Sequence, residues 1–212
     1  MGKHQKREVP SMLRNILDID AQVTEKLVKW VEKCMPLKQL KVHYTILEIS
    51  CHGIPWLASV LAFIWILNSK SLYQMQVNLL LGLLLDIVIV AILKALARRR
   101  RPAATNDPFA MGPDKYSFPS GHASRSMLIL YVYYYLYPVS VIFLLPIIAW
   151  VFSVALSRLL MRRHHILDIV VGLLLGYIEG MLLGFLYLDA QTCAYLVAWI
   201  TDEKIDGAEY DV

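Results

Sequence analysis

Long apolar segments separated by short polar ones dominate the chain. A helix needs about 20 apolar residues to cross the hydrocarbon core of a bilayer, and segments 46–67, 77–97 and 167–188 meet that length. Segment 123–156 is too long for one ordinary span and is interrupted near Tyr137-Pro138, which favours two short spans over one long tilted helix. The pattern therefore predicts an all-α, polytopic membrane bundle with about five transmembrane helices.

The N-terminal segment follows a different pattern. Apolar residues recur three and four positions apart over 11–35, with charges between them, which predicts an amphipathic helix that ends at Pro36. It is too charged to span, so we expect it to lie on the membrane interface or to pack on the bundle, as an ordinary surface helix would. The predicted regions are a basic arm with this amphipathic helix (1–45), a transmembrane domain (46–190) and a C-terminal tail (191–212).

Composition and charge agree with a membrane protein. Hydrophobic residues make up 58% and charged residues 18% of the 212 residues, against about 45–50% and 25% in a soluble domain. Lys and Arg gather in 1–42 and 98–101, and the last eleven residues are acidic. The positive-inside rule therefore places the N-terminus in the cytosol. No basic domain stands apart from the spans, so nucleic acid is not an expected partner.

Two polar clusters offer sites for an anion. Lys94 and Arg101 lie seven residues apart, about two helical turns, so both cations would face one side of a helix. The Pro119–His122 sequence places Gly121 at the predicted start of a helix, where free N–H groups and the positive end of the helix dipole attract anions.

A third cluster adds a histidine with an acidic partner. Ser157-Arg158 is followed by His164 and Asp168, which lie four residues apart on one helix face, where a carboxylate fixes the imidazole tautomer. Each cluster alone has an ordinary structural explanation: a topology signal, a helix cap or a structural His–Asp pair. Together with His122 of the second cluster they suit phosphoryl transfer, in which cations offset phosphate charge, one imidazole attacks, and the other protonates the leaving oxygen.

The pattern K-x6-RP, PSGH and SR-x5-H-x3-D resembles the three-part signature of the type 2 phosphatidic acid phosphatase (PAP2) superfamily over residues 77–188. The resemblance implies that His164 is the nucleophile of a phosphohistidine intermediate, that Asp168 orients it, and that His122 is the general acid and then the base. The resemblance further implies that no metal or other cofactor is needed. It also implies that the transmembrane domain 46–190 is the catalytic domain. The residues implied to hold the phosphoryl oxygens are Lys94, Arg101, Ser120, Gly121 and Arg158.

Shorter strings, EISCHGIPW (48–56) and DKYSFPSGHASR (114–125), resemble the animal polyisoprenoid and presqualene diphosphate phosphatases. That resemblance implies farnesyl, geranylgeranyl or presqualene diphosphate as substrate. The expected location is the endoplasmic reticulum or nuclear envelope, and the positive-inside rule places the active site, like the N-terminus, in the cytosol. Phosphatidate, lysophosphatidate or sphingosine 1-phosphate is the alternative substrate. A vanadate haloperoxidase, a transporter and a non-enzymatic membrane scaffold are the alternatives from other classes.

Several conspicuous residues have no place in the signature. His165 is expected to be a bystander, and the run Arg98–Arg100 to set topology or contact lipid headgroups. Asp86 and Glu179 fall within predicted spans, where ionisable groups are costly, and a hydrogen bond inside the bundle is favoured over a place on a substrate path. The tyrosines of 131–137 predict an aromatic belt at the interface.

Overall fold

The computed structural model describes residues 10–34, 41–103 and 115–201, and almost all of them are helical. The predicted basic arm before residue 10 and the acidic tail after residue 201 lie outside the described residues. The elements are α1 (Ser11–Cys34), α2 (Lys41–Ser50), α3 (Gly53–Leu67), α4 (Lys70–Ala97), α5 (Gly121–Tyr131), the π-helical turn η2 (Val132–Leu136), α6 (Val141–Leu160), α7 (Ile166–Phe185) and α8 (Ala190–Thr201).

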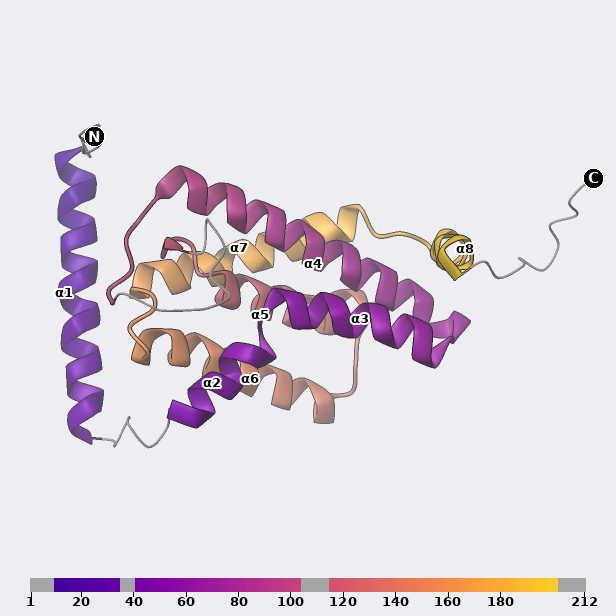
Figure 1. Ribbon diagram of the computed structural model, residues 1–212, viewed down its shortest axis with the longest axis horizontal. Coiled ribbons are helices and arrows are strands. Elements are labelled where there is room, and N and C mark those ends of the chain that lie inside the picture. The colour runs from indigo at the N-terminus through magenta and orange to yellow at the C-terminus, as the bar shows by residue number, and fades with distance from the viewer. Residues whose placement is uncertain (1–9, 35–40, 104–114, 202–212) are drawn as a thin grey trace, which may run out of the picture.

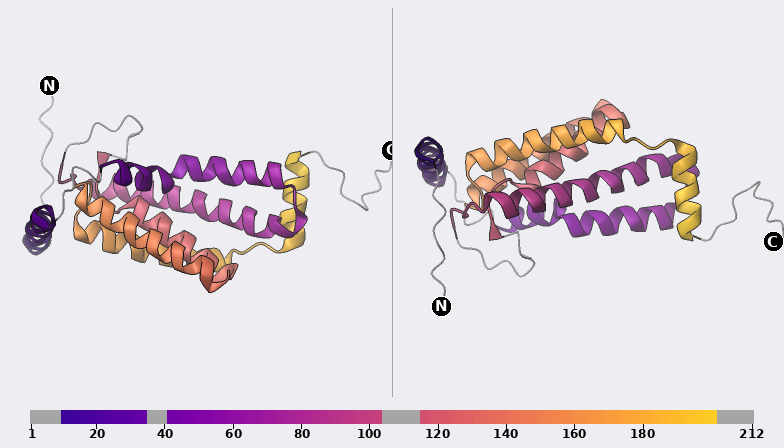
Figure 2. Two further views of the ribbon diagram at one scale, coloured as in Figure 1. Left: turned by 90° about the horizontal axis from the view of Figure 1, so that it is seen from below. Right: turned by 90° about the horizontal axis from the view of Figure 1, so that it is seen from above.

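The helices form an elongated bundle closed by one crossing helix at each end. Helices α3 to α7 run along the long axis, α1 lies across one end, and α8 lies across the other (Figures 1 and 2). The predicted amphipathic helix over 11–35 is confirmed as α1, and the short apolar piece 193–200 lies within α8. The N-terminal helix therefore sits at a bundle end, beside the start of α7.

Among the described residues, three helices are long and apolar enough to cross a membrane: α4, α6 and α7. The predicted span 46–67 is a bent pair instead, with α2 and α3 meeting at 55°, and it makes a fourth crossing if counted as one span. The segment from 123 towards Tyr137 forms α5 and η2, which are 11 and 5 residues long. Together these two elements are shorter than the usual transmembrane helix, so they do not supply the fifth span that the sequence predicted. The predicted helical membrane bundle itself is confirmed.

A row of glycines brings α7 against α5. Gly172, Gly176 and Gly180 recur every four residues on one face of α7. A methyl group at Gly176 would overlap the Ser124 carbonyl oxygen, and one at Gly172 would come within 2.6 Å of the Ser120 carbonyl oxygen. Small residues thus allow backbone contact between the two helices, as in many membrane helix pairs. The PSGH turn that precedes α5 is thereby held against the first turn of α7.

The two acidic residues predicted within spans are buried in a polar cluster in the bundle. Asp86 Oδ2 of α4 lies 2.7 Å from Arg125 Nη2 of α5. Ser124 Oγ donates to Glu179 Oε2 of α7 over 3.0 Å, and both acidic residues are fully buried. The expectation of bundle-internal polar contacts for Asp86 and Glu179 therefore agrees with the structure, and the cluster joins three helices.

Candidate active site

The three signature clusters meet at the end of the bundle that α1 crosses (Figure 1). Helix α4 ends just after Lys94, α5 begins at Gly121, α6 ends just after Arg158, and α7 begins just before Asp168. His164 lies in the short connection between α6 and α7. The residues that the sequence singles out are therefore carried to one place by the ends of four helices.

The His164 ring is held with one nitrogen available for attack. The side chain is buried, and its Nδ1 donates to the Ser117 backbone carbonyl over 2.7 Å. A carbonyl can only accept, so Nδ1 carries the proton and Nε2 keeps its lone pair. Burial, with the nearby charges of Arg101 and Lys94, lowers the pKa of His164 to about 3, against the opposing effect of Asp168. A neutral imidazole is the nucleophilic form.

Asp168 does not form the expected hydrogen bond with His164. Its Oδ2 lies 3.9 Å from His164 Nδ1, too far for a hydrogen bond. That oxygen accepts instead from the His165 backbone N–H over 2.8 Å and from His165 Nδ1 over 3.2 Å. Asp168 Oδ1 accepts from Arg99 Nη1 over 2.7 Å. His165 and Arg99, expected to lie outside the site, therefore fix the Asp168 carboxylate.

His122, the expected general acid, faces the N-terminal half of the bent helix pair. Its Nε2 donates to the backbone carbonyl of Glu48 over 3.2 Å, and its own carbonyl accepts from Cys51 Sγ over 3.2 Å. Electrostatic interactions connect the His122 ring with Arg158, His164 and Lys94. The two imidazoles and the cations thus belong to one cluster.

The expected phosphate-binding cations are held at the same end. Arg158 is 1% exposed and Lys94 5% exposed, and cations buried this deeply are uncommon in proteins unless they are paired. Arg158 Nη1 donates to Glu48 Oε1 over 2.9 Å, and Arg163 Nη2 lies 3.7 Å from the same oxygen. The Glu48 carboxylate is therefore paired with the Arg158 guanidinium, which the family resemblance implies is a phosphate-binding group.

The PSGH turn is fixed by contacts to both α5 and α7. Ser120 is the N-cap of α5, and its hydroxyl accepts from the Ala123 N–H over 3.5 Å. The Ser120 N–H donates to the Asp168 backbone carbonyl over 3.0 Å. At Gly121 a methyl group would come within 3.1 Å of Val90 Cγ1 on α4, so a small residue fits closely there. The start of α5 and the start of α7 are thereby tied together.

Three residues of the site were not singled out from the sequence. Ser117 contributes a backbone carbonyl, which no side-chain pattern reveals. Glu48 had a sequence signal, because it is a lone acidic residue near the start of an apolar segment. Arg99 was hidden in a run of four arginines, of which only Arg101 belongs to the signature.

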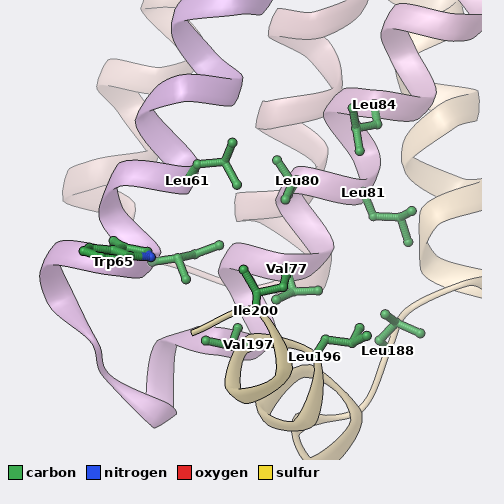
Figure 3. A pocket seen from close by; sticks show the side chains of 11 residues that line it. Leu61, Trp65, Val77, Leu80, Leu81, Leu84, Leu188, Leu196, Val197 and Ile200 are labelled. Carbon is green, nitrogen blue, oxygen red and sulfur yellow. The ribbon is translucent and has the colours of Figure 1, made fainter. Parts of the chain in front are cut away.

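Within the described ranges, no group of three or more His, Cys, Asp or Glu side chains is placed to hold a metal ion. An apolar pocket of about 440 Å³ lies near the opposite end of the bundle, between α3, α4 and α8, with Trp65, Leu80 and Val197 among its lining residues (Figure 3).

A smaller apolar groove runs nearer the site. It has a volume of about 200 Å³ and lies between α6 and α7. Its walls reach Leu159, the neighbour of Arg158, and Ile166, two residues after His164. The remaining lining residues are Val151, Phe152, Ala155, Leu156, Ile169, Val170 and Leu173.

A helical membrane protein with two imidazoles and buried cations at one bundle end is suited to phosphoryl chemistry. The profile of the PAP2 superfamily matches residues 76–191, more than half of the chain, and the chain belongs to that superfamily. It is 32% identical over 151 residues to a protein of Arabidopsis thaliana named "Probable lipid phosphate phosphatase beta", covering 58% of this chain and 71% of the relative. The crystal structure of Aquifex aeolicus LpxE has the same fold, with a TM-score of 0.57 and 23% identity over 74% of this chain and 92% of LpxE.

Proposed function

We propose that this chain is a membrane lipid phosphatase that hydrolyses isoprenoid diphosphates and monophosphates through a phosphohistidine at His164. The lipid phosphatase class rests on membership of the PAP2 superfamily and on the lipid phosphate phosphatase relative. The isoprenoid substrates, of the farnesyl, geranylgeranyl and presqualene type, rest on the 48–56 and 114–125 strings.

The proposed reaction has two steps. His164 Nε2 attacks phosphorus, the N–P bond forms, and the bond from phosphorus to the leaving oxygen breaks while His122 gives that oxygen a proton. Water then attacks the phosphohistidine, His122 takes the water proton, and the N–P bond breaks to release phosphate. Lys94, Arg101 and Arg158 offset charge on the phosphoryl oxygens.

One observation carries the proposal best: the hydrogen bond from His164 Nδ1 to the Ser117 carbonyl. It leaves Nε2 as the nucleophilic nitrogen, and burial keeps the ring neutral by lowering its pKa to about 3. A histidine that served only as a structural donor would have no need of the nearby cations Arg101 and Lys94.

The hydrocarbon chain of the substrate is proposed to occupy the groove between α6 and α7. That groove is lined by apolar side chains only, and it lies between the two helices whose ends carry Arg158 and Asp168. Burial of apolar chain surface there contributes about 25 cal/mol per Å². A lipid could thus keep its chain among the helices while its phosphate reaches His164.

The proposed function is tested by phosphate release from purified protein in detergent with EDTA. Farnesyl diphosphate, farnesyl monophosphate and phosphatidate are compared for the wild type, His164→Asn and the neighbouring control His165→Asn. Release by the wild type that disappears in His164→Asn supports the mechanism, with His165→Asn retaining a clear part of the rate. Well-folded wild-type protein that releases no phosphate from any of them contradicts the proposal.

Phosphatidate and related lipid phosphates are the second candidate substrates, and the name of the Arabidopsis relative favours them. A ratio of kcat/KM that favours phosphatidate over farnesyl diphosphate would replace the isoprenoid assignment and keep the phosphatase class.

We also propose an endoplasmic reticulum or nuclear envelope location with the site on the cytosolic side. Helix α1 and Arg98–Arg101 lie at the same bundle end as His164, and positive charge favours the cytosol. Protease protection of a tag at each terminus in sealed microsomes tests the side, and a lumenal N-terminus would contradict it.

A further inference from the structure

Helix α1 lies outside the 76–191 segment matched by the superfamily profile, yet it contacts the first turn of α7. Asp20 Oδ1 accepts from the Leu167 N–H over 3.0 Å, and Thr24 Oγ1 accepts from the Ile166 N–H over 3.1 Å. The first N–H groups of a helix have no acceptor within the helix. Two of those on α7 are therefore satisfied by side chains of a different helix.

The same Asp20 carboxylate is connected to Asp168 through Arg99. Asp20 Oδ2 lies 2.7 Å from Arg99 Nη2, and Arg99 Nη1 lies 2.7 Å from Asp168 Oδ1. The Arg99 side chain is 12% exposed, the Asp20 side chain 10% and the Asp168 side chain fully buried. One guanidinium thus bridges two carboxylates with little access to water, an arrangement that strengthens charge-assisted hydrogen bonds.

Arg99 also supports His164 through its backbone. Its carbonyl accepts from the Ser117 N–H over 2.8 Å, and the Ser117 carbonyl accepts from His164 Nδ1 over 2.7 Å. The position of one arginine therefore bears on both the Asp168 carboxylate and the carbonyl that sets the His164 tautomer.

We propose that Asp20 is a positioning residue of the active site, which acts through Arg99 on Asp168 and His164, and that α1 is part of the catalytic unit. Without the Asp20 charge, Arg99 has one anionic partner in place of two, and its guanidinium and backbone lose a fixed position. The ring of His164 then points its Nε2 less accurately at phosphorus, and small misplacements of a nucleophile are costly. This inference rests on the proposed phosphatase function.

The test compares three substitutions on the same helix. Asp20→Asn keeps an oxygen that can cap α7 but places an uncharged group against Arg99. Thr24→Val removes the other cap and leaves the Arg99 bridge intact. Asp18→Asn changes an exposed carboxylate on α1 and serves as the charge control. Each is measured for kcat and KM with farnesyl diphosphate, and for melting temperature in detergent.

Asp20→Asn is expected to lower kcat about tenfold or more, the size expected when a charge-assisted hydrogen bond is lost, with KM changed less than threefold or so. Thr24→Val and Asp18→Asn are expected to keep kcat within about threefold of the wild type. Equal losses in Asp20→Asn and Thr24→Val would mean that α1 serves only as a structural cap, and would overturn the proposal.

A double-substitution cycle tests the route through Arg99. Arg99→Gln alone is expected to lower kcat, and adding Asp20→Asn to it is expected to change kcat by less than about twofold. Independent, multiplying losses would contradict action through Arg99.

Hydrogen exchange separates this inference from the proposed function. Asp20→Asn is expected to speed amide exchange in the peptides that contain Ser117 and residues 164–168, whether or not the wild type hydrolyses the chosen lipids. Wild-type inactivity would refute the proposed function alone. Unchanged exchange in both peptides, or unchanged kcat in an active enzyme, would refute the role of Asp20.

Discussion

The ion pair between Glu48 and Arg158 places a carboxylate where the proposed mechanism places a phosphoryl group. Arg158 Nη1 lies 2.9 Å from Glu48 Oε1, with only 2% of the arginine side chain and 18% of the glutamate side chain exposed. If Arg158 holds the phosphoryl group as proposed, an entering phosphate competes with Glu48 for the guanidinium. Glu48→Gln weakens the competing contact but keeps its length, and it keeps the backbone carbonyl that His122 contacts.

The magnitude follows from the two kinds of hydrogen bond. A bond to a charged group contributes about 1.5–3 kcal/mol and a neutral bond about 0.5–1.5 kcal/mol. The substitution should therefore lower the free-energy cost of freeing Arg158 for an anion by about 1–2 kcal/mol, which corresponds to an increase of about 5–30-fold in anion affinity. Inorganic phosphate, the product, should inhibit Glu48→Gln at a concentration lower by about that factor.

The assay is competitive inhibition of farnesyl diphosphate hydrolysis by inorganic phosphate at fixed pH and ionic strength. Glu32→Gln is the matched control, because Glu32 pairs with the partly exposed Arg162 over 3.2 Å, and exposed pairs contribute little. An inhibition constant for Glu48→Gln that is unchanged or higher than in the wild type would show that Arg158 does not bind the phosphoryl group in competition with Glu48.

Three further predictions follow from the packing, the buried histidine and the groove. Gly176→Ala should lower stability by about 1–3 kcal/mol, since its methyl group meets the Ser124 carbonyl oxygen; Gly184→Ala, where the nearest atom is 3.4 Å away, should leave the melting temperature unchanged, and equal shifts would contradict the packing argument. Because the pKa of His164 is about 3 when folded and about 6.5 when unfolded, the unfolded chain binds the extra proton between those values, so this residue lowers stability as pH falls. At pH 5 the free energy of unfolding is lower by about 2 kcal/mol because of this residue. His164→Asn should therefore lose less stability than the wild type between pH 7 and pH 5, and equal losses would contradict the claim that His164 is buried in its neutral form. Ala155→Trp in the groove should raise KM for farnesyl diphosphate and leave hydrolysis of the water-soluble p-nitrophenyl phosphate unchanged, with Phe143→Trp, at an exposed position on the same helix, as control; parallel effects on both substrates would argue against the groove.

The sequence was most informative where a pattern is local or repeats along a helix. The apolar segments predicted the membrane bundle, and 3–4 spacing predicted α1 nearly to the residue. Hydropathy alone could not show that Cys51-His52 would break the first span into α2 and α3, or that Gly121 would start a helix too short to cross. Both outcomes depend on packing against α4, α6 and α7, which a window along the chain does not contain.

The candidate site shows the same limit. The spacing of Lys94, Arg101, His122, Arg158, His164 and Asp168 predicted which residues the helix ends would bring to one place, while their catalytic roles stay predictions. Long-range contacts were not predictable: Arg99 and Asp20 are 79 residues apart, and Arg158 and Glu48 are 110 apart. A backbone carbonyl, that of Ser117, takes the hydrogen bond that a local i,i+4 pattern assigned to Asp168.

The most direct test of the account is to trap the covalent intermediate. Wild-type protein, His164→Asn and His165→Asn are mixed with isoprenoid diphosphate labelled in the terminal phosphate, quenched with alkali within milliseconds, and digested for mass spectrometry under conditions that preserve phosphohistidine. We expect phosphate on the peptide that contains His164 in the wild type and in His165→Asn, and none in His164→Asn. Steady turnover by His164→Asn, or phosphate on a different residue of the active wild type, would contradict it.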